Sequence, residues 1–249
     1  RFGLALVILF LVCVQDNINA DLDNDILYFS YTAAILFREW ETSVFRYRCS
    51  GVIISNRHIL TTATCIEDKD GNDIKVRVGS TYSYTRGLKH NVDSVRKHFN
   101  FSPDLDADIA VLTLSEPLKL SYRVGVANLP EQDAVINIPN SLNKEIITNV
   151  TYFTNYKINR CSDSMELETT VGCNGYFKNK PPFKDMVTED MLCVVFHANP
   201  EDRQPFDSLG APLVINGTVY GLYSWARRDN FSVKIFTRVS AFSKWIKKF

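Results

Sequence analysis

The sequence has no excess of charge of either sign. Its 28 Lys and Arg residues balance its 28 Asp and Glu residues, so the formal net charge is zero at pH 7. This balance excludes binding of nucleic acid or of an anionic membrane through bulk charge. The 249-residue chain also lacks low-complexity tracts, internal repeats and linkers rich in proline, glycine and serine. A single folded unit can therefore account for its length.

No apolar run in the sequence is long enough to cross a bilayer as a helix, which takes about 20 residues. The apolar run 4–14 follows the basic Arg1 and precedes a small-residue site at 18–20. This order predicts a secretory signal peptide over residues 1–20 and a secreted, extracellular chain that begins at Asp21. An uncleaved anchor or a core strand is the alternative interpretation of the same run.

Cysteine is sparse, but five of the six cysteines lie in the predicted mature region. They are Cys49, Cys65, Cys161, Cys173 and Cys193. In a secreted chain such thiols pair as disulfides, and an odd number leaves one over. Secretion also agrees with four sequons for N-linked glycosylation. These sequons begin at Asn100, Asn149, Asn216 and Asn230.

Short runs rich in β-branched and aromatic residues recur along the chain and are separated by turns. They include 52–54, 74–78, 109–114, 146–153 and 219–223. Asn216 and Gly217 lie between two apolar runs, and both tolerate positive φ, so they predict a two-residue hairpin. The whole pattern predicts an all-β protein, built as a barrel or a sandwich.

The last residues, 239–249, predict a short helix. Phe242, Trp245, Ile246 and Phe249 recur at the spacing that places them on one helical face. An apolar face of this size indicates that the helix docks on the β-structure.

The segment 49–65 reads CSGVIISNRHILTTATC and resembles, without a gap, the pattern C-G-G-S-L-I-S-x-x-W-V-L-T-A-A-H-C. That pattern is the first active-site segment of the trypsin/chymotrypsin-like serine proteases. Four further segments resemble the same family in the right order, at 106–118, 189–193, 212–225 and 235–246. The resemblance covers nearly all of the predicted mature chain.

The resemblance implies a fold of two packed antiparallel β-barrels with the active site in the cleft between them. It implies one homology domain over 21–249. The barrels are expected at about 29–133 and 134–238, and the C-terminal helix at 239–249.

In this family a serine attacks the carbonyl, a histidine takes its proton, an aspartate orients the histidine, and backbone N–H groups bind the oxyanion. The alignment places Thr64 at the histidine, Asp108 at the aspartate and Leu209 at the serine. A threonine hydroxyl cannot act as a general base near neutral pH, and leucine has no nucleophilic atom. A one-residue slip would offer Ser208 as the nucleophile, but it would insert a residue before Pro212 in a tight loop.

The residues that would activate such an enzyme and shape its specificity pocket also differ. Residues 21–28 lack the family's I-V-G-G motif and its basic cleavage residue, and Ser208 replaces the acidic partner of the new N-terminus. The pocket positions fall on Arg203, Ser224, Trp225, Ala226 and Lys234. An open pocket with Arg203 and Lys234 would prefer an acidic group. The alternative is a collapsed pocket with both side chains in solvent.

The resemblance also implies two disulfides, Cys49–Cys65 and Cys173–Cys193. Cys161 is then left for an intermolecular bond, remains a buried thiol, or pairs with Cys173 instead. No cofactor or metal is expected, since no Cys/His spacing suggests zinc. The acidic run 67–73 lacks the spacing of a calcium loop, and residues 82–90, where the family binds calcium, are neutral to basic.

The sequence therefore predicts a secreted, catalytically inactive serine protease homologue of insect type. Such a protein acts by binding an extracellular protein partner, as an adaptor, a cofactor or a decoy for a protease, a substrate or an inhibitor. No nucleic-acid or membrane partner is expected. The alternative is an active trypsin-like serine endopeptidase with unusual catalytic residues.

Overall fold

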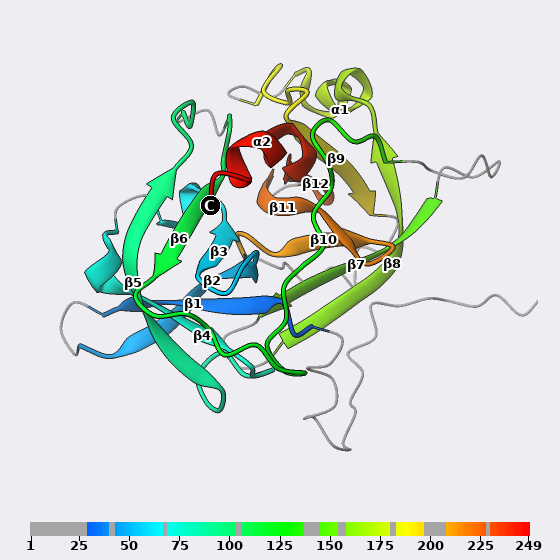
Figure 1. The fold of residues 1–249 in the computed structure, drawn as a ribbon. Coiled ribbons are helices and arrows are strands. Elements are labelled where there is room, and N and C mark those ends of the chain that lie inside the picture. Colours follow the sequence, from blue (N-terminus) through cyan, green and yellow to red (C-terminus); the bar gives the residue numbers. More distant parts are fainter. Residues whose placement is uncertain are drawn as a thin grey trace, which may run out of the picture.

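The computed structural model describes residues 29–39, 43–66, 69–102, 106–136, 145–153, 158–179, 183–196, 208–227 and 230–249. The described chain forms two closed antiparallel β-barrels of six strands each, followed by a short C-terminal helix (Figure 1). The predicted fold class is therefore confirmed. Within these ranges no helix combines the length and the apolar character needed to span a membrane.

The first barrel is built from consecutive strands. They are β1 (Thr32–Arg38), β2 (Phe45–Ile53), β3 (His58–Thr61), β4 (Ile74–Val78), β5 (Leu88–Lys97) and β6 (Ala110–Leu114). Their order around the barrel is β1-β2-β3-β6-β5-β4. Along β1, Ala33 and Ile35 point into the barrel core, whereas Ala34 and Leu36 join a second apolar cluster with Phe29. Alternate side chains of a strand point to opposite faces, so a run buried on both faces is apolar throughout.

The second barrel uses the later part of the chain. Its strands are β7 (Glu145–Phe153), β8 (Ile158–Glu168), β9 (Met191–Phe196), β10 (Pro212–Ile215), β11 (Thr218–Arg227) and β12 (Asn230–Arg238). Their order is β10-β11-β12-β9-β8-β7. The hairpin predicted between β10 and β11 is confirmed, with Asn216 at φ 49° and Gly217 at φ 76°. Both values are positive, as the tight turn requires.

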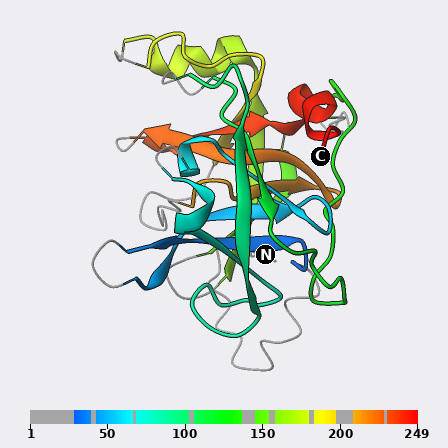
Figure 2. The ribbon, with the colours of Figure 1, turned by 60° about the vertical axis from the view of Figure 1, so that its left-hand side comes forward.

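Helical structure is limited in the described chain, and one helix was not predicted. That helix is α1 (Thr170–Phe177), which begins where the Thr169 hydroxyl accepts a hydrogen bond from the Gly172 N–H at 3.1 Å. Such a side-chain cap satisfies one of the free N–H groups of the first turn. Figure 2 shows α1 at the upper edge of the molecule. Shorter 3₁₀ turns are η2 (Thr64–Ile66) and η3 (Gly71–Asp73).

The C-terminal segment is helical over a shorter range than predicted. A 3₁₀ turn, η5 (Val239–Phe242), leads into one turn of α-helix, α2 (Ser243–Ile246). The predicted apolar face is nevertheless the face that packs, since Phe242 and Ile246 are each 5% exposed. The Ser243 hydroxyl fastens the helix by donating to the Pro130 carbonyl at 2.7 Å.

The two barrels and the C-terminal segment share one apolar cluster. Val52, Leu60, Ile109 and Val111 come from the first barrel and its edge, Val214, Val219 and Leu222 from the second, and Val239, Phe242 and Ile246 from the C-terminal segment. Full burial of one such side chain stabilises a fold by about 1.5–3 kcal/mol. This cluster therefore fixes the two barrels against each other.

Two disulfides join the chain as the resemblance implies. Cys49 in the middle of β2 pairs with Cys65 in η2, and Cys173 in α1 pairs with Cys193 in β9. Cys161 lies on β8, but its side chain is outside the described part, so its pairing stays a prediction. The predicted signal peptide lies entirely outside the described residues.

The four predicted glycosylation positions lie in different environments. Asn100 and Asn216 are exposed and lie in turns. Asn149 lies within β7, where it pairs with Val214 on one side and Ser162 on the other. Asn230 begins β12. Glycosylation at all four positions stays a prediction.

Alanine in place of two different glycines should change stability in opposite directions. A Cβ at Gly217 or at Gly175 would meet nothing within 4 Å, but Gly217 has φ 76° and Gly175 lies in α1. We expect Gly217→Ala to lower the free energy of unfolding by about 1 kcal/mol, because positive φ strains an L-residue. Gly175→Ala should raise it by about 0.5–1 kcal/mol. Urea unfolding of both variants checks this, and equal effects would contradict it.

Candidate functional site

The structure brings the predicted catalytic positions together where the two barrels meet. Asp108 lies two residues before the start of β6 and is only 1% exposed. Its Oδ1 accepts a hydrogen bond from the backbone N–H of Thr64 at 2.7 Å, and its Oδ2 accepts one from the Ser224 hydroxyl at 2.5 Å. Thr64 belongs to the first barrel and Ser224 to the second. The carboxylate therefore connects the barrels directly.

The environment of Asp108 suits a fixed hydrogen-bond acceptor. Burial raises the pKa of this carboxyl, and the hydrogen bonds from Ser224 and Thr64 oppose that rise only in part. Its backbone carbonyl also accepts a hydrogen bond from the Thr237 hydroxyl at 2.7 Å. In a serine protease the carboxylate would orient a histidine. Here the residue at that position contributes its backbone N–H, which any residue type except proline could supply.

Leu209 fills the position of the nucleophile with an apolar side chain. The side chain packs against the core clusters of both the first and the second barrel. Its carbonyl accepts a hydrogen bond from the Ser50 N–H at 2.8 Å, so the backbone is also held to β2. Leucine offers no atom that could attack a carbonyl. At this point the chain has packing in place of nucleophilic chemistry.

Gly210, the next residue, keeps the loop tight. Its φ is 74°, and a Cβ there would lie 2.3 Å from the Ser50 carbonyl oxygen and 2.5 Å from the Thr61 hydroxyl. Its N–H donates to the Tyr223 carbonyl at 2.8 Å. Only glycine fits both this backbone conformation and this close approach. The loop therefore keeps a fixed shape although the residue beside it has no catalytic atom.

Ser208, the alternative nucleophile, lies in a cluster of hydroxyl groups. It is 2% exposed, and its Oγ is 2.5 Å from the Tyr47 hydroxyl and 2.6 Å from the Ser50 hydroxyl. Burial raises the pKa of Tyr47 to about 12. A phenol of that pKa keeps its proton near neutral pH and cannot serve as a general base. Sequence analysis missed Tyr47, because 161 positions separate it from Ser208.

The three histidines of the described chain lie elsewhere, and His90 lies on β5, where it pairs with Val76. His58 Nδ1 bonds to the Ser55 hydroxyl at 2.8 Å, within the turn between β2 and β3, and its ring packs against Phe249. His98 accepts the Asn100 N–H at Nδ1 and packs between Phe242 and Trp245 of the C-terminal segment. Within the described ranges none of them hydrogen-bonds to Ser208 or Asp108. His197 lies outside these ranges.

The four predicted pocket positions that the structure describes have buried or half-buried side chains. Trp225 is 7% exposed and packs against Phe177 of α1 and against Phe183, with ring centroids 5.5 and 5.7 Å away. Ser224 is engaged with Asp108. Ala226 is half-buried and pairs with Lys234 across β11 and β12.

The alternative of a collapsed pocket with both side chains in solvent is wrong for Lys234, because this side chain is buried. It is 5% exposed, and its Nζ lies 5.7 Å from the centre of the Tyr223 ring. The reason is that both faces of this part of β12 are covered, since its neighbours Val233 and Ile235 on the opposite face are buried as well. Arg203 lies outside the described residues, so a preference of the pocket for acidic groups stays a prediction.

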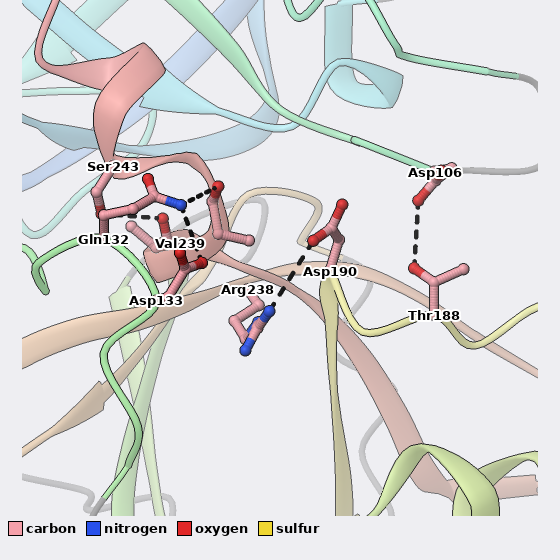
Figure 3. A network of polar contacts seen from close by, with 9 residues as sticks. Asp106, Gln132, Asp133, Thr188, Asp190, Arg238, Val239 and Ser243 are labelled. Atoms are coloured by element: carbon pink, nitrogen blue, oxygen red, sulfur yellow. Dashed lines mark hydrogen bonds and ion pairs between the residues drawn. The ribbon is translucent and has the colours of Figure 1, made fainter.

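A second polar network crosses the seam below the C-terminal helix (Figure 3). Thr188 donates to Asp106 at 3.2 Å, and Arg238 approaches Asp190 at 3.9 Å. Burial, followed by the charge of Asp106, raises the pKa of Asp190. The contact of Thr188 with Asp106 joins the second barrel to the first, whereas Arg238 and Asp190 both belong to the second barrel. In the described chain no group of three His, Cys, Asp or Glu residues could hold a metal ion.

Comparison with known proteins gives consistent results. The sequence profile of the family described as Trypsin matches residues 24–246. A trypsin of Phaedon cochleariae is 28% identical over 260 residues, covering 100% of this chain and 98% of the relative. Kallikrein-2 of Homo sapiens is 28% identical, covering 84% of this chain and 83% of the relative.

Solved structures of low sequence identity share the fold. The scabies mite inactivated protease paralogue S-D1 has a TM-score of 0.73 at 18% identity, covering 90% of this chain and 93% of the other. The paralogue S-I1 has a TM-score of 0.71 at 20% identity, covering 90% of this chain and 95% of the other. At these identities the likeness concerns the fold alone.

The burial of Asp108 should make stability depend on pH in a defined direction. The pKa of Asp108 in the folded chain is raised above 3.8, its ordinary value in the unfolded chain. At a pH between the unfolded and the folded pKa, the folded chain therefore binds more protons than the unfolded chain. The contribution of Asp108 to the free energy of unfolding should therefore increase as the pH falls from neutral towards 4. Asp108→Asn removes this contribution.

Urea unfolding of the wild type and of Asp108→Asn over a series of pH values measures the difference. We expect the stability of the wild type relative to the variant to increase on acidification. Asp185→Asn, at a carboxylate that is 73% exposed, is the control for general charge effects. A difference that stays constant or shrinks on acidification would contradict the assignment.

Proposed function

The chain belongs to the trypsin family, and from that premise we propose that it is a non-catalytic member that acts by binding another extracellular protein. Its partner in this proposal is a protease, a protease substrate or a protease inhibitor. The protein would act as an adaptor, a cofactor or a decoy. The fold of an enzyme does not by itself imply the activity of that enzyme, so the proposal is argued from the residues at the catalytic positions.

Leu209 is the observation that carries the proposal. The residue at the nucleophile position is held by packing against both barrels and by a backbone hydrogen bond to Ser50. Thr64, at the general-base position, offers Asp108 only a backbone N–H. Two of the three chemical roles are therefore lost within a frame whose loop and carboxylate are still in place.

Ser208 does not restore the missing chemistry. Its hydroxyl is buried and bonded to two other hydroxyls, and Tyr47 keeps its proton at neutral pH. An activated serine needs an adjacent base that accepts its proton. This environment favours a structural role for Ser208.

The comparisons lend support of two kinds. Two of the solved structures with the same fold are of inactivated protease paralogues. The similar sequences include proteins named trypsin and kallikrein-2. The first group shows that this fold also occurs in inactivated proteins, whereas the names of the second group are those of proteases, so the site residues carry the proposal.

A fluorophosphonate probe, which labels only activated serines, tests the loss of catalysis. We expect no labelling of the natural full-length protein, because the residue at the attacking position has no nucleophilic atom. Trypsin is the positive control. The double variant Thr64→His/Leu209→Ser is the matched variant, and we expect it to be labelled above the natural protein.

Mass spectrometry of any labelled peptide identifies the attacking residue. Labelling of Ser208 in the natural protein would overturn the proposal and favour an active endopeptidase. If no label is found, the protein is used as bait in the fluid from which it is secreted. Recovery of a protease, substrate or inhibitor is the expected result of that second step.

A further inference from the structure

Two segments of the first barrel lie side by side at the end of β5 that is remote from the catalytic positions. The first is the β4–β5 loop, residues 79–87, and the second is the segment 119–126 after β6 (Figure 1). A Cβ at Gly79 would lie 3.1 Å from Val124, so the segments touch. Leu88 begins β5, whereas Lys97 at its other end pairs with Ala110 beside Asp108. A ten-residue strand spans about 30 Å.

The β4–β5 loop is held in shape by a buried cation. Arg77 of β4 is 8% exposed, and its guanidinium donates to the backbone carbonyls of Ser83, Tyr84 and Arg86. The Ser80 hydroxyl donates to the Thr85 carbonyl at 2.9 Å. Three carbonyls converging on one internal charge fix the path of the loop before any partner arrives. Such preorganisation lowers the entropy lost on binding.

The two segments present tyrosine, arginine and an exposed aliphatic side chain together. Tyr84 is 58% exposed, Leu88 64% and Tyr122 67%. The Arg123 guanidinium lies 5.3 Å from the centre of the Tyr122 ring, and its Nε donates to the Tyr122 hydroxyl at 2.9 Å. Tyrosine and arginine are the residue types most enriched where interfaces gain their binding energy.

The charge of this region has one sign although the whole chain is neutral. Residues 79–92 and 117–126 contain no Asp or Glu, while they contain Arg86, Lys89, Lys119 and Arg123. The acids that flank these stretches in the sequence are Asp93 and Glu116, and the charge of Glu116 acts on His90. A basic surface of this kind is complementary to an acidic one, which sets orientation and the rate of association.

We propose that Tyr84, Arg86, Leu88, Lys119, Tyr122 and Arg123 form a docking surface for an acidic segment of a protein partner, one that also carries apolar side chains. We call these six residues the tyrosine–arginine surface. Its biological role rests on the proposed function, since a protein without catalysis needs a binding surface. The surface itself lies away from the catalytic positions, so it would be present whether or not those positions support catalysis.

Selection of peptides from an unbiased displayed library on the immobilised full-length protein is the first step. We expect enrichment of peptides that combine Asp or Glu with aromatic or aliphatic residues. The affinity of a selected peptide is then measured for the wild type and for variants. The double variant Arg86→Glu/Lys119→Glu should weaken binding by about tenfold or more, with weaker salt dependence. Tyr122→Ala should weaken it as well.

A matched control makes the same change of charge elsewhere. Lys178 and Lys244 are exposed and lie outside both segments, so Lys178→Glu/Lys244→Glu should leave the affinity within about twofold. Melting temperatures of all variants show that each has folded. Equal losses in both double variants, or selected peptides without acidic residues, would overturn the proposal.

Two further results separate this proposal from others. If Tyr122→Ala leaves the affinity unchanged while the charge reversals abolish it, the surface is a simple polyanion site and the proposal fails. Fluorophosphonate labelling of the natural protein would refute the loss of catalysis without changing these affinities. The two proposals therefore fail by different measurements.

Discussion

The carboxylate of Asp108 is buried where the two barrels pack together, and it needs hydrogen-bond donors there because a buried charge without hydrogen bonds is costly. One oxygen takes the N–H of Thr64 from the first barrel, and the other takes the hydroxyl of Ser224 from the second. The Thr237 hydroxyl adds a third bond, to the backbone carbonyl of the same residue. These bonds hold the barrels in the relative position that the shared apolar cluster also requires. The geometry of an active-site frame is thereby kept by interactions that serve packing and need no catalysis.

The loop from Ser208 to Gly210 is held in one shape with a leucine at the nucleophile position. A serine with two hydroxyl partners is neutral, so its burial carries no cost of an unpaired charge. Leu209 adds contact with both barrel cores, and Gly210 permits the close approach to Ser50. Each of these residues favours the same rigid loop, while none of them can move a proton to or from a substrate. The contacts that shape the loop therefore do not require a serine at position 209.

Local patterns in the sequence predicted five strand segments, which fall on β2, β4, β6, β7 and β11, together with the Asn216-Gly217 turn and the apolar face of the C-terminal segment. Each of these depends on residues a few positions apart. The helix α1 was not predicted, because Gly172 and Gly175 lower its intrinsic propensity and it is held by packing and by the Cys173–Cys193 bond. The contact of Tyr47 with Ser208 and the burial of Lys234 also could not be read locally. Both depend on which strands become neighbours when the barrels close. The family pattern located Thr64, Asp108 and Leu209, but only the fold shows what each of them contacts.

The packing of the C-terminal segment affects how the chain can fold during its synthesis. Val52, Leu60 and Ile109 belong to the first half of the sequence, yet they are covered by Val239, Phe242 and Ile246. The first six strands are made well before those residues, and chains begin to fold from the N-terminus as they emerge. The early barrel can therefore close while this apolar face is still open to water. Until the last residues arrive, this apolar face of the nascent chain is a surface on which other chains could associate.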